Sequence, residues 1–138
     1  MTILDTDIFT LLASGHPRVA ERFRREEDQV ALTIVTRIET LEGRFAFLMK
    51  AADGQQLLQA QQWLERSERD LANFLLLPFD AAAATEFDRL RQNKRLKKIG
   101  RGDLLIAAVA LGRRALLVSR NLRDFRQVPG LRVENWAD

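Results

Sequence analysis

Four acidic side chains occupy the same kind of place in the chain. Asp5, Glu39, Asp103 and Asp124 each stand where an apolar, strand-like run gives way to a helix-like one. In an open α/β sheet, residues that follow the carboxyl ends of separate strands meet in one crevice. Carboxylates gathered there repel one another, and a hard divalent cation such as Mg²⁺ or Mn²⁺ relieves that repulsion because it prefers oxygen ligands. The pattern therefore predicts a metal-dependent enzyme.

Each acid taken alone also has a purely structural explanation. The helix dipole stabilises a carboxylate in the first turn by about 0.3–1 kcal/mol, which suffices for Asp5 or Asp103. Thr36 and Glu39 have the spacing of a capping box, in which Glu39 reaches back to the amide of Thr36. We favour a shared site because the helices expected to begin at Arg18 and near Gln55 carry no comparable acid after a strand.

The runs around these acids predict strands that alternate with helices. The expected strands cover residues 3–4, 29–33, 75–79, 115–119 and 131–133, the last of them at a sheet edge. The expected helices cover residues 5–13, 18–25, 36–50, 55–71, 81–98 and 103–111. This order predicts an α/β fold, a single-domain three-layer sandwich with a central, mostly parallel sheet flanked by helices.

The composition suits one domain over residues 1–138, with 46% hydrophobic residues to form a single core. The absence of cysteine excludes disulfides, thiolate metal sites and cysteine nucleophiles, and fits a reducing compartment. Because the first residues lack the basic segment of a secretory signal and no apolar run could span a bilayer, we expect a cytoplasmic protein. A net charge of +3 beside an acidic pocket favours a polyanionic substrate.

Five segments carry a further signal through their order along nearly the whole chain. They are residues 4–8 (LDTDI), 36–43 (TRIETLEG), 99–108 (IGRGDLLIAA), 118–125 (VSRNLRDF) and 129–136 (PGLRVENW). Together they resemble the PIN-domain ribonucleases, in particular the VapC-type toxins of bacterial toxin–antitoxin pairs. No single segment is specific for that family, but the five segments in this order are specific for it.

The resemblance implies a metal-dependent endoribonuclease that uses Mg²⁺ or Mn²⁺. Asp5, Glu39 and Asp103 would be metal ligands, and Asp124 would complete the set directly or through water and accept a proton from the attacking water. Related proteins place the fourth acid at the position of either Asn121 or Asp124. We choose Asp124, assisted by Asn121 and Ser119.

Two departures from the family pattern leave the core acids intact. The family usually has Asn where this chain has Asp7, a change that keeps an oxygen ligand and adds charge. It often has Pro-Asn or a similar pair before the third acid, where this chain has Arg101 and Gly102.

Basic residues between Arg89 and Arg101 lead directly to Asp103. As phosphate contacts they would hold an RNA backbone beside the acids, and a solvated helix face explains them equally well. The candidate substrate-binding residues are Lys97, Lys98, Arg101, Ser119 and Arg120.

The resemblance also implies partners. These are an RNA substrate, with transfer or ribosomal RNA as candidates, a VapB-like antitoxin that occludes the acidic pocket, and a second copy of the chain in a homodimer. Phe45, Phe47 and Trp63 would mark a dimer face or antitoxin groove if they proved exposed.

Three other classes of protein compete with a nuclease. A receiver domain needs a Lys after a late strand, which residues 118–121 lack, and a haloacid-dehalogenase-type phosphatase needs a downstream Lys and acidic pair that are not evident. The remaining alternative is a catalytically silent PIN-like module that binds RNA or a protein partner. His16, the only histidine, has no triad partner and belongs to a surface turn.

Overall fold

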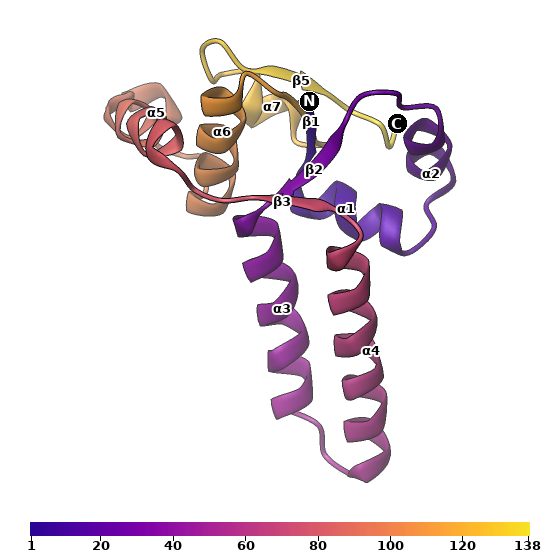
Figure 1. Ribbon diagram of the computed structural model, residues 1–138. Coiled ribbons are helices and arrows are strands. Elements are labelled where there is room, and N and C mark those ends of the chain that lie inside the picture. Colours follow the sequence, from indigo (N-terminus) through magenta and orange to yellow (C-terminus); the bar gives the residue numbers. More distant parts are fainter.

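A fully parallel five-stranded sheet forms the centre of the molecule in the computed structural model, which describes all of residues 1–138 (Figure 1). The strands are β1 (Thr2–Leu4), β2 (Val30–Thr33), β3 (Leu75–Leu77), β4 (Leu116–Val118) and β5 (Arg132–Glu134). Their order is β3-β2-β1-β4-β5, which makes β5 an edge strand. The α/β class, the parallel sheet and the edge position of the last strand are therefore confirmed.

Helices connect these strands and cover both faces of the sheet. The helices are α1 (Thr6–Ala13), α2 (Pro17–Arg24), α3 (Ile34–Met49), α4 (Gly54–Ala72), α5 (Ala81–Gln92), a 3-10 turn η1 (Lys94–Leu96), α6 (Arg101–Arg113) and α7 (Leu122–Phe125). None of them is both long and apolar enough to traverse a bilayer.

Two hydrophobic clusters lie on opposite faces of the sheet because neighbouring residues of a strand point to opposite sides. Ile3 and Leu117 pack into a cluster of 19 buried residues formed with α5 and α6. Leu4 and Val118 pack into a cluster of nine buried residues that includes Phe9 of α1. The sheet thus fixes α1 on one side and α6 on the other, with the ends of β1 and β4 between them.

Helices α3 and α4 form an antiparallel hairpin that projects away from the sheet (Figure 1). Their inner contacts include the Phe47 and Trp63 rings, whose centroids lie 5.0 Å apart, and the Arg44 guanidinium above Trp63. Many of the hairpin's outer apolar side chains face solvent, Met49 at 80% exposure and Leu58 at 59%. The apolar face expected for residues 36–50 is therefore only partly buried within the chain.

The helices expected over residues 36–50, 81–98 and 103–111 have wrong boundaries, and the capping-box interpretation falls with the first of them. The last of them, α6, extends two residues further at each end, over Arg101–Arg113. Helix α3 begins at Ile34, and its N-cap is Thr33, whose hydroxyl accepts from the amide of Thr36 at 3.4 Å. Thr36 is therefore inside the helix, and Glu39 lies more than a turn beyond the cap. The helix expected over residues 81–98 ends at Gln92, because Asn93 leaves the helical conformation and caps η1 instead.

Acidic N-caps are more widespread than the sequence pattern indicated. Asp53 caps α4, and Asp80, which follows β3, caps α5. Asp80 accepts from the amide of Ala83 at 2.9 Å and lies 3.4 Å from the Arg113 guanidinium. An acid at a strand–helix junction is thus insufficient to indicate a site, and the surroundings of each acid must decide.

Candidate active site

A polar pocket of about 700 Å³ lies beyond the carboxyl ends of β1, β2 and β4. Its lining contains no hydrophobic residue and consists of Asp5, Thr6, Asp7, Thr10, Glu39, Asp103, Arg120, Asn121 and Asp138. Three of the four acids singled out in the sequence therefore share one cavity. Asp124 is outside the lining and adjoins it through Asn121.

Asp5 links β1 to α1 and is the most deeply buried acid of the pocket, with 5% of its surface exposed. One of its carboxylate oxygens caps α1 by accepting from the amide of Ile8 at 2.9 Å. Burial raises the pKa of Asp5 to about 6, against the opposing effects of the Ser119 hydroxyl and the Ile8 amide, while the charges of Asp7 and Asp103 raise it further. The pocket therefore holds this carboxylate at a free-energy cost when it is ionised.

Glu39 reaches the pocket from α3 and is positioned by threonines. The Thr6 hydroxyl donates to Glu39 Oε1 at 2.6 Å and lies 3.0 Å from the Thr36 hydroxyl. Gly102 makes room for the same carboxylate, because a Cβ there would lie 2.9 Å from Glu39 Oε2. Elements α1, α3 and α6 thus jointly determine where this acid lies.

Asp103 stands in the first turn of α6, and Asn121 connects it to Asp124. The amide nitrogen of Asn121 donates to Asp103 Oδ2 at 3.2 Å and to Asp124 Oδ2 at 3.0 Å. Burial raises the pKa of Asp103, as do the charges of Glu39 and Asp124, while the bond from Asn121 opposes them. Asn121 therefore spaces two carboxylates that would otherwise repel one another.

Two further predicted residues flank this group after β4. The buried Ser119 hydroxyl accepts from the amide of Asn121 at 2.9 Å, which fixes the turn into α7. Arg120 lines the pocket and lies 3.8 Å from Asp7. Arg120 is the only basic residue in the lining, so the pocket remains strongly acidic.

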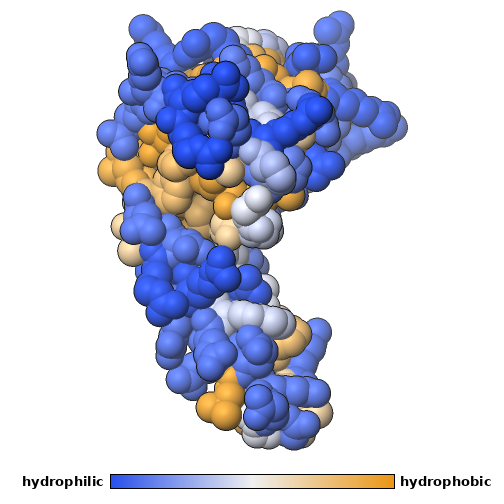
Figure 2. Space-filling model, turned by 90° about the vertical axis from the view of Figure 1, so that its right-hand side faces the viewer, coloured by the Kyte–Doolittle hydropathy of each residue, from blue (hydrophilic) through white to orange (hydrophobic).

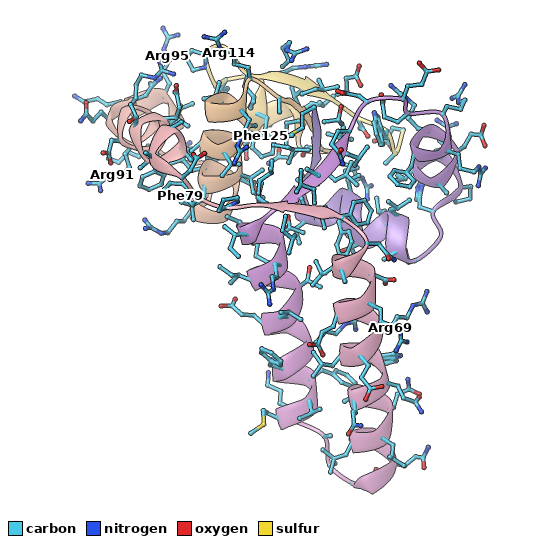
Figure 3. All side chains as sticks on the ribbon, in the orientation of Figure 1. Arg69, Phe79, Arg91, Arg95, Arg114 and Phe125 are labelled. Atoms are coloured by element: carbon cyan, nitrogen blue, oxygen red, sulfur yellow. The ribbon has the colours of Figure 1, made fainter.

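Three of the predicted substrate-binding residues lie outside the pocket. The Arg101 guanidinium sits above the Phe87 ring at 5.3 Å. Lys97 lines a separate cavity beside η1, and Lys98 is exposed in the turn that follows. Arg91 and Arg95 point outward from the same region (Figure 3). The basic residues therefore lie on α5, η1 and the turn before α6 instead of on one continuous helix, and they form a solvated surface that leads to α6.

The pocket offers donor atoms suited to a hard cation, although they are not gathered into a ready coordination shell. Its carboxylate, hydroxyl and amide oxygens suit such an ion, and burial, with a smaller contribution from neighbouring carboxylates, raises the pKa of Asp5 and of Asp103. No group of three His, Cys, Asp or Glu side chains is close enough to hold a metal ion. Bonds from Thr6 and Asn121 keep the carboxylates apart, so cation binding requires side-chain rotation about an otherwise suitable donor set.

The fold and this pocket define an α/β protein with a carboxylate site at the carboxyl edge of a parallel sheet. A family model for the PIN domain matches residues 2–131. The chain therefore belongs to the PIN-domain family, as its sequence segments indicated.

Named relatives and solved structures of similar fold cover nearly the whole chain. The tRNA(fMet)-specific endonuclease VapC of Shigella flexneri is 29% identical over 142 residues, covering 98% of this chain and 97% of the relative. Ribonuclease VapC2 of Haemophilus influenzae is 28% identical with the same coverage. The crystal structure of DNA-bound VapBC from Salmonella typhimurium superposes with a TM-score of 0.81 at 26% identity, covering 98% and 97% of the two chains.

Four residues of the site were missed in the sequence: Thr6, Thr10, Gly102 and Asp138 line the pocket or shape it. Thr6 lies between two acids in Asp-Thr-Asp, and Gly102 directly precedes Asp103, so both had a local signal. Asp138 had none, because only the return of the chain past β5 brings it to the pocket.

Proposed function

We propose that this chain is a Mg²⁺- or Mn²⁺-dependent endoribonuclease that hydrolyses RNA phosphodiester bonds, and that it is the toxin of a type II toxin–antitoxin pair. Residues 1–138 act as a single nuclease domain in the cytoplasm. The observation that carries the proposal is that Asp5, Glu39 and Asp103 line one pocket in a chain of the PIN-domain family.

Asp5, Glu39 and Asp103 would hold the cation, with Asp124 or Asn121 completing the ligand set. When bound, the ion supplies positive charge against the phosphate oxygens and lowers the pKa of a bound water. The chain itself holds the carboxylates in place. Asp5 is fixed as the N-cap of α1, and Glu39 is fixed by the hydrogen bond that Thr6 donates. Asn121 orients the carboxylates of Asp103 and Asp124 through its amide.

Asp124 is suited to accept the proton of the attacking water. Its Oδ2 receives the Asn121 amide, which leaves its other oxygen free to face a substrate. Asp124 lies just outside the cavity lining, so it can act there without being a required ligand. Arg120, which now lies near Asp7, can turn toward a phosphate once a cation and RNA change the local charge.

RNA is the proposed substrate because the chain carries a net charge of +3 and the relatives that match nearly its whole length are named as nucleases. One of these relatives is named for its action on tRNA(fMet). We propose a structured RNA of the transfer or ribosomal class, in which unpaired bases present a single phosphodiester bond.

The α3–α4 hairpin is the proposed contact surface for partners. Figure 2 shows apolar surface where the hairpin joins the sheet domain and again at the hairpin's far end. Phe45, Phe47 and Trp63 are each more than a third exposed, which fits the expected homodimer and a small VapB-like antitoxin. A toxin of this kind would be silent while the antitoxin covers its acidic pocket.

Cleavage of total bacterial RNA by the purified protein tests the proposal directly. Wild type should produce discrete cuts with Mg²⁺ or Mn²⁺ and none with EDTA, and Asp103→Asn should cut at none of these sites. Mn²⁺ should also raise the melting temperature of wild type more than that of Asp103→Asn, because a ligand that binds the folded state stabilises it.

A folded wild-type protein that binds RNA without cutting it under any metal condition would favour the alternative, the catalytically silent PIN-like module. Removal of any bound antitoxin by unfolding and refolding is the necessary control, since a blocked pocket would give the same result.

A further inference from the structure

A second cavity of about 700 Å³ adjoins the acidic pocket and is rich in arginine. Helix α2 supplies Arg18 and Arg22, its C-cap is Arg25, and Arg126 directly follows α7. The α2 side of the molecule faces the viewer in Figure 2, and its surface there is mostly hydrophilic. Four guanidinium groups from two parts of the chain therefore surround one hollow, here named the arginine pocket.

Two of these guanidinium groups are engaged by carboxylates and two are not. Arg22 bonds to Glu26 at 2.9 Å and stacks over Trp136 at 4.8 Å. Arg25 lies 3.6 Å from Glu21. Arg18 and Arg126 are exposed and form no ion pair, so their guanidinium groups are free to bind an anion.

The arginine pocket is continuous with the acidic pocket through the end of the chain. Asp138 lines both cavities, and the Asn135 amide holds its carboxylate at 2.7 Å. A strand whose phosphate lies among the acids would meet Asp138 and then the arginines. Free guanidinium groups are therefore available beside the acidic pocket, and arginine matches phosphate geometry well.

The lining favours a nucleic-acid backbone over a protein segment. Only two of its eleven residues are hydrophobic, and one of these, Trp136, is buried beneath Arg22. The four arginines outnumber the three carboxylates of the lining, Glu21, Glu134 and Asp138, of which Glu134 lies 3.8 Å from Arg22. Protein segments usually anchor through buried apolar or aromatic side chains, whereas phosphate contacts need only charge and hydrogen-bond donors.

We propose that the arginine pocket binds phosphates of the RNA strand beside the bond that is cut, with Arg18 and Arg126 as the contacts. This inference rests on the proposed ribonuclease function and adds to it a substrate path on the α2 side. It is separate from the basic residues between Arg89 and Arg101, which lie near α5 and α6.

The test compares wild type with the double variant Arg18→Gln and Arg126→Gln. Binding of a short single-stranded oligoribonucleotide is followed by fluorescence anisotropy in EDTA over a range of KCl concentrations, so that it does not depend on cleavage. The variant should bind about tenfold more weakly at low salt, and its salt slope should fall by about 1.4, since each contact to a single strand contributes about 0.7.

The matched control is the double variant Lys50→Gln and Arg69→Gln, which removes the same charge from the hairpin. Neither side chain forms an ion pair or lines either cavity, and Arg69 projects from α4 (Figure 3). Its RNA affinity and salt slope should remain near those of wild type. If both double variants lost the same RNA affinity, the change in net charge alone would explain the loss, and the proposal would be overturned.

Cleavage separates this inference from the proposed function. If wild type cuts RNA with Mn²⁺, the arginine-pocket variant should need about tenfold more RNA for half-maximal rate and keep its rate at saturation. Unchanged RNA affinity in that variant overturns the pocket assignment while the ribonuclease function stands. Loss of binding to an Asp- and Glu-rich peptide, with RNA binding intact, would assign the pocket to a protein partner instead. A wild type that binds RNA through the pocket but cuts nothing contradicts the ribonuclease function alone.

Discussion

At the scale of single residues, site acids and capping acids differ in their surroundings and not in their local geometry. Asp5, Asp53 and Asp80 each cap a helix and accept from the amide three residues on at 2.9 Å. Only Asp5 also faces other carboxylates in a shared cavity. Burial raises the pKa of Asp5, and the neighbouring carboxylates add to that rise, so the pKa of Asp5 is a measurable signature of the site.

Asp5→Asn should stabilise the metal-free protein at neutral pH. The folded-state pKa rises from 3.8 to about 6, so the folded chain binds more protons than the unfolded chain between these values, and stability falls as pH rises through them. Asparagine removes the charge and keeps the oxygen that caps α1. The expected gain is about 1–3 kcal/mol above that window. The gain in stability should vanish at pH values below both pKa values. Urea unfolding at a series of pH values measures it.

Asp53→Asn is the matched control for this experiment, because Asp53 caps α4 on the exposed hairpin away from the acidic pocket. Asp53→Asn removes the same charge without relieving repulsion among carboxylates, so it should give no stability gain at neutral pH. A stability gain for Asp5→Asn that was independent of pH, or that appeared equally in Asp53→Asn, would refute electrostatic strain at Asp5.

Gly102→Ala should lower RNA cleavage and leave the fold intact. The new Cβ would lie 2.9 Å from Glu39 Oε2, the end of a flexible side chain, so the carboxylate moves and the backbone does not. We expect cleavage to fall by about tenfold or more, since small misplacements of catalytic groups cost about 10²-fold. The free energy of unfolding should change by less than about 1 kcal/mol. Single-turnover cleavage and urea unfolding are the two measurements.

Gly43→Ala provides the control, because a Cβ there meets nothing within 4 Å on the exposed face of α3. Alanine should stabilise that helix by up to about 1 kcal/mol and leave cleavage unchanged. Normal cleavage by Gly102→Ala would mean that the observed position of Glu39 is not required for catalysis.

At the scale of elements, the sequence predicted the existence and order of strands and helices better than their ends. A continuous apolar run such as that of β4 is recognisable as a central strand, because its side chains must be buried on both faces of the sheet. Helix ends depend on which nearby side chain caps best. Thr33 caps α3 in place of Thr36, and Asn93 ends α5 by capping η1, choices that local propensity does not decide.

The same limit applies to the candidate site. Asp5 was recognisable from its place after β1 and from the family segments. Glu39 and Asp103 lie inside α3 and α6, and α6 follows η1 instead of a strand, so the family segments, and not a strand end, identify these two acids. The bond from Thr6 to Glu39 joins residues 33 positions apart, and Asp138 reaches the pocket only through the path of the chain after β5. Contacts of that kind depend on tertiary packing, so no periodic pattern in the sequence predicts them.

Substitution of the basic residues between η1 and α6 tests whether they contact RNA. Lys97→Ala combined with Lys98→Ala should weaken RNA binding uniformly across sequences and lower the salt slope by about 1–2, because each phosphate contact contributes nearly one unit. Both lysines are exposed, so the fold should be unaffected. Lys50→Ala serves as the control, and affinity is measured across KCl concentrations. An unchanged slope would leave the two lysines as part of a solvated surface.

At the scale of the whole molecule, the two polar pockets and most of the exposed large apolar side chains lie in different regions. The sheet domain carries the acidic pocket and the arginine pocket, both lined almost entirely by polar or charged residues. The hairpin carries exposed Phe45, Met49 and Leu58. The division suits a protein that handles RNA at one end and binds protein partners along the other.

This division predicts that self-association depends on the hairpin. Met49→Lys combined with Leu58→Lys should convert a dimer into a monomer, because burying each apolar side chain contributes about 1.5–3 kcal/mol and a buried, unpaired lysine opposes association. Gln55→Lys with Gln62→Lys adds the same charge to exposed polar positions of α4 and should leave the dimer intact. Sedimentation velocity distinguishes the two states. If the Met49 and Leu58 variant stayed dimeric, the dimer contact would lie outside the hairpin's apolar side chains. If both variants dissociated equally, the added positive charge would explain the loss of the dimer and the prediction would be wrong.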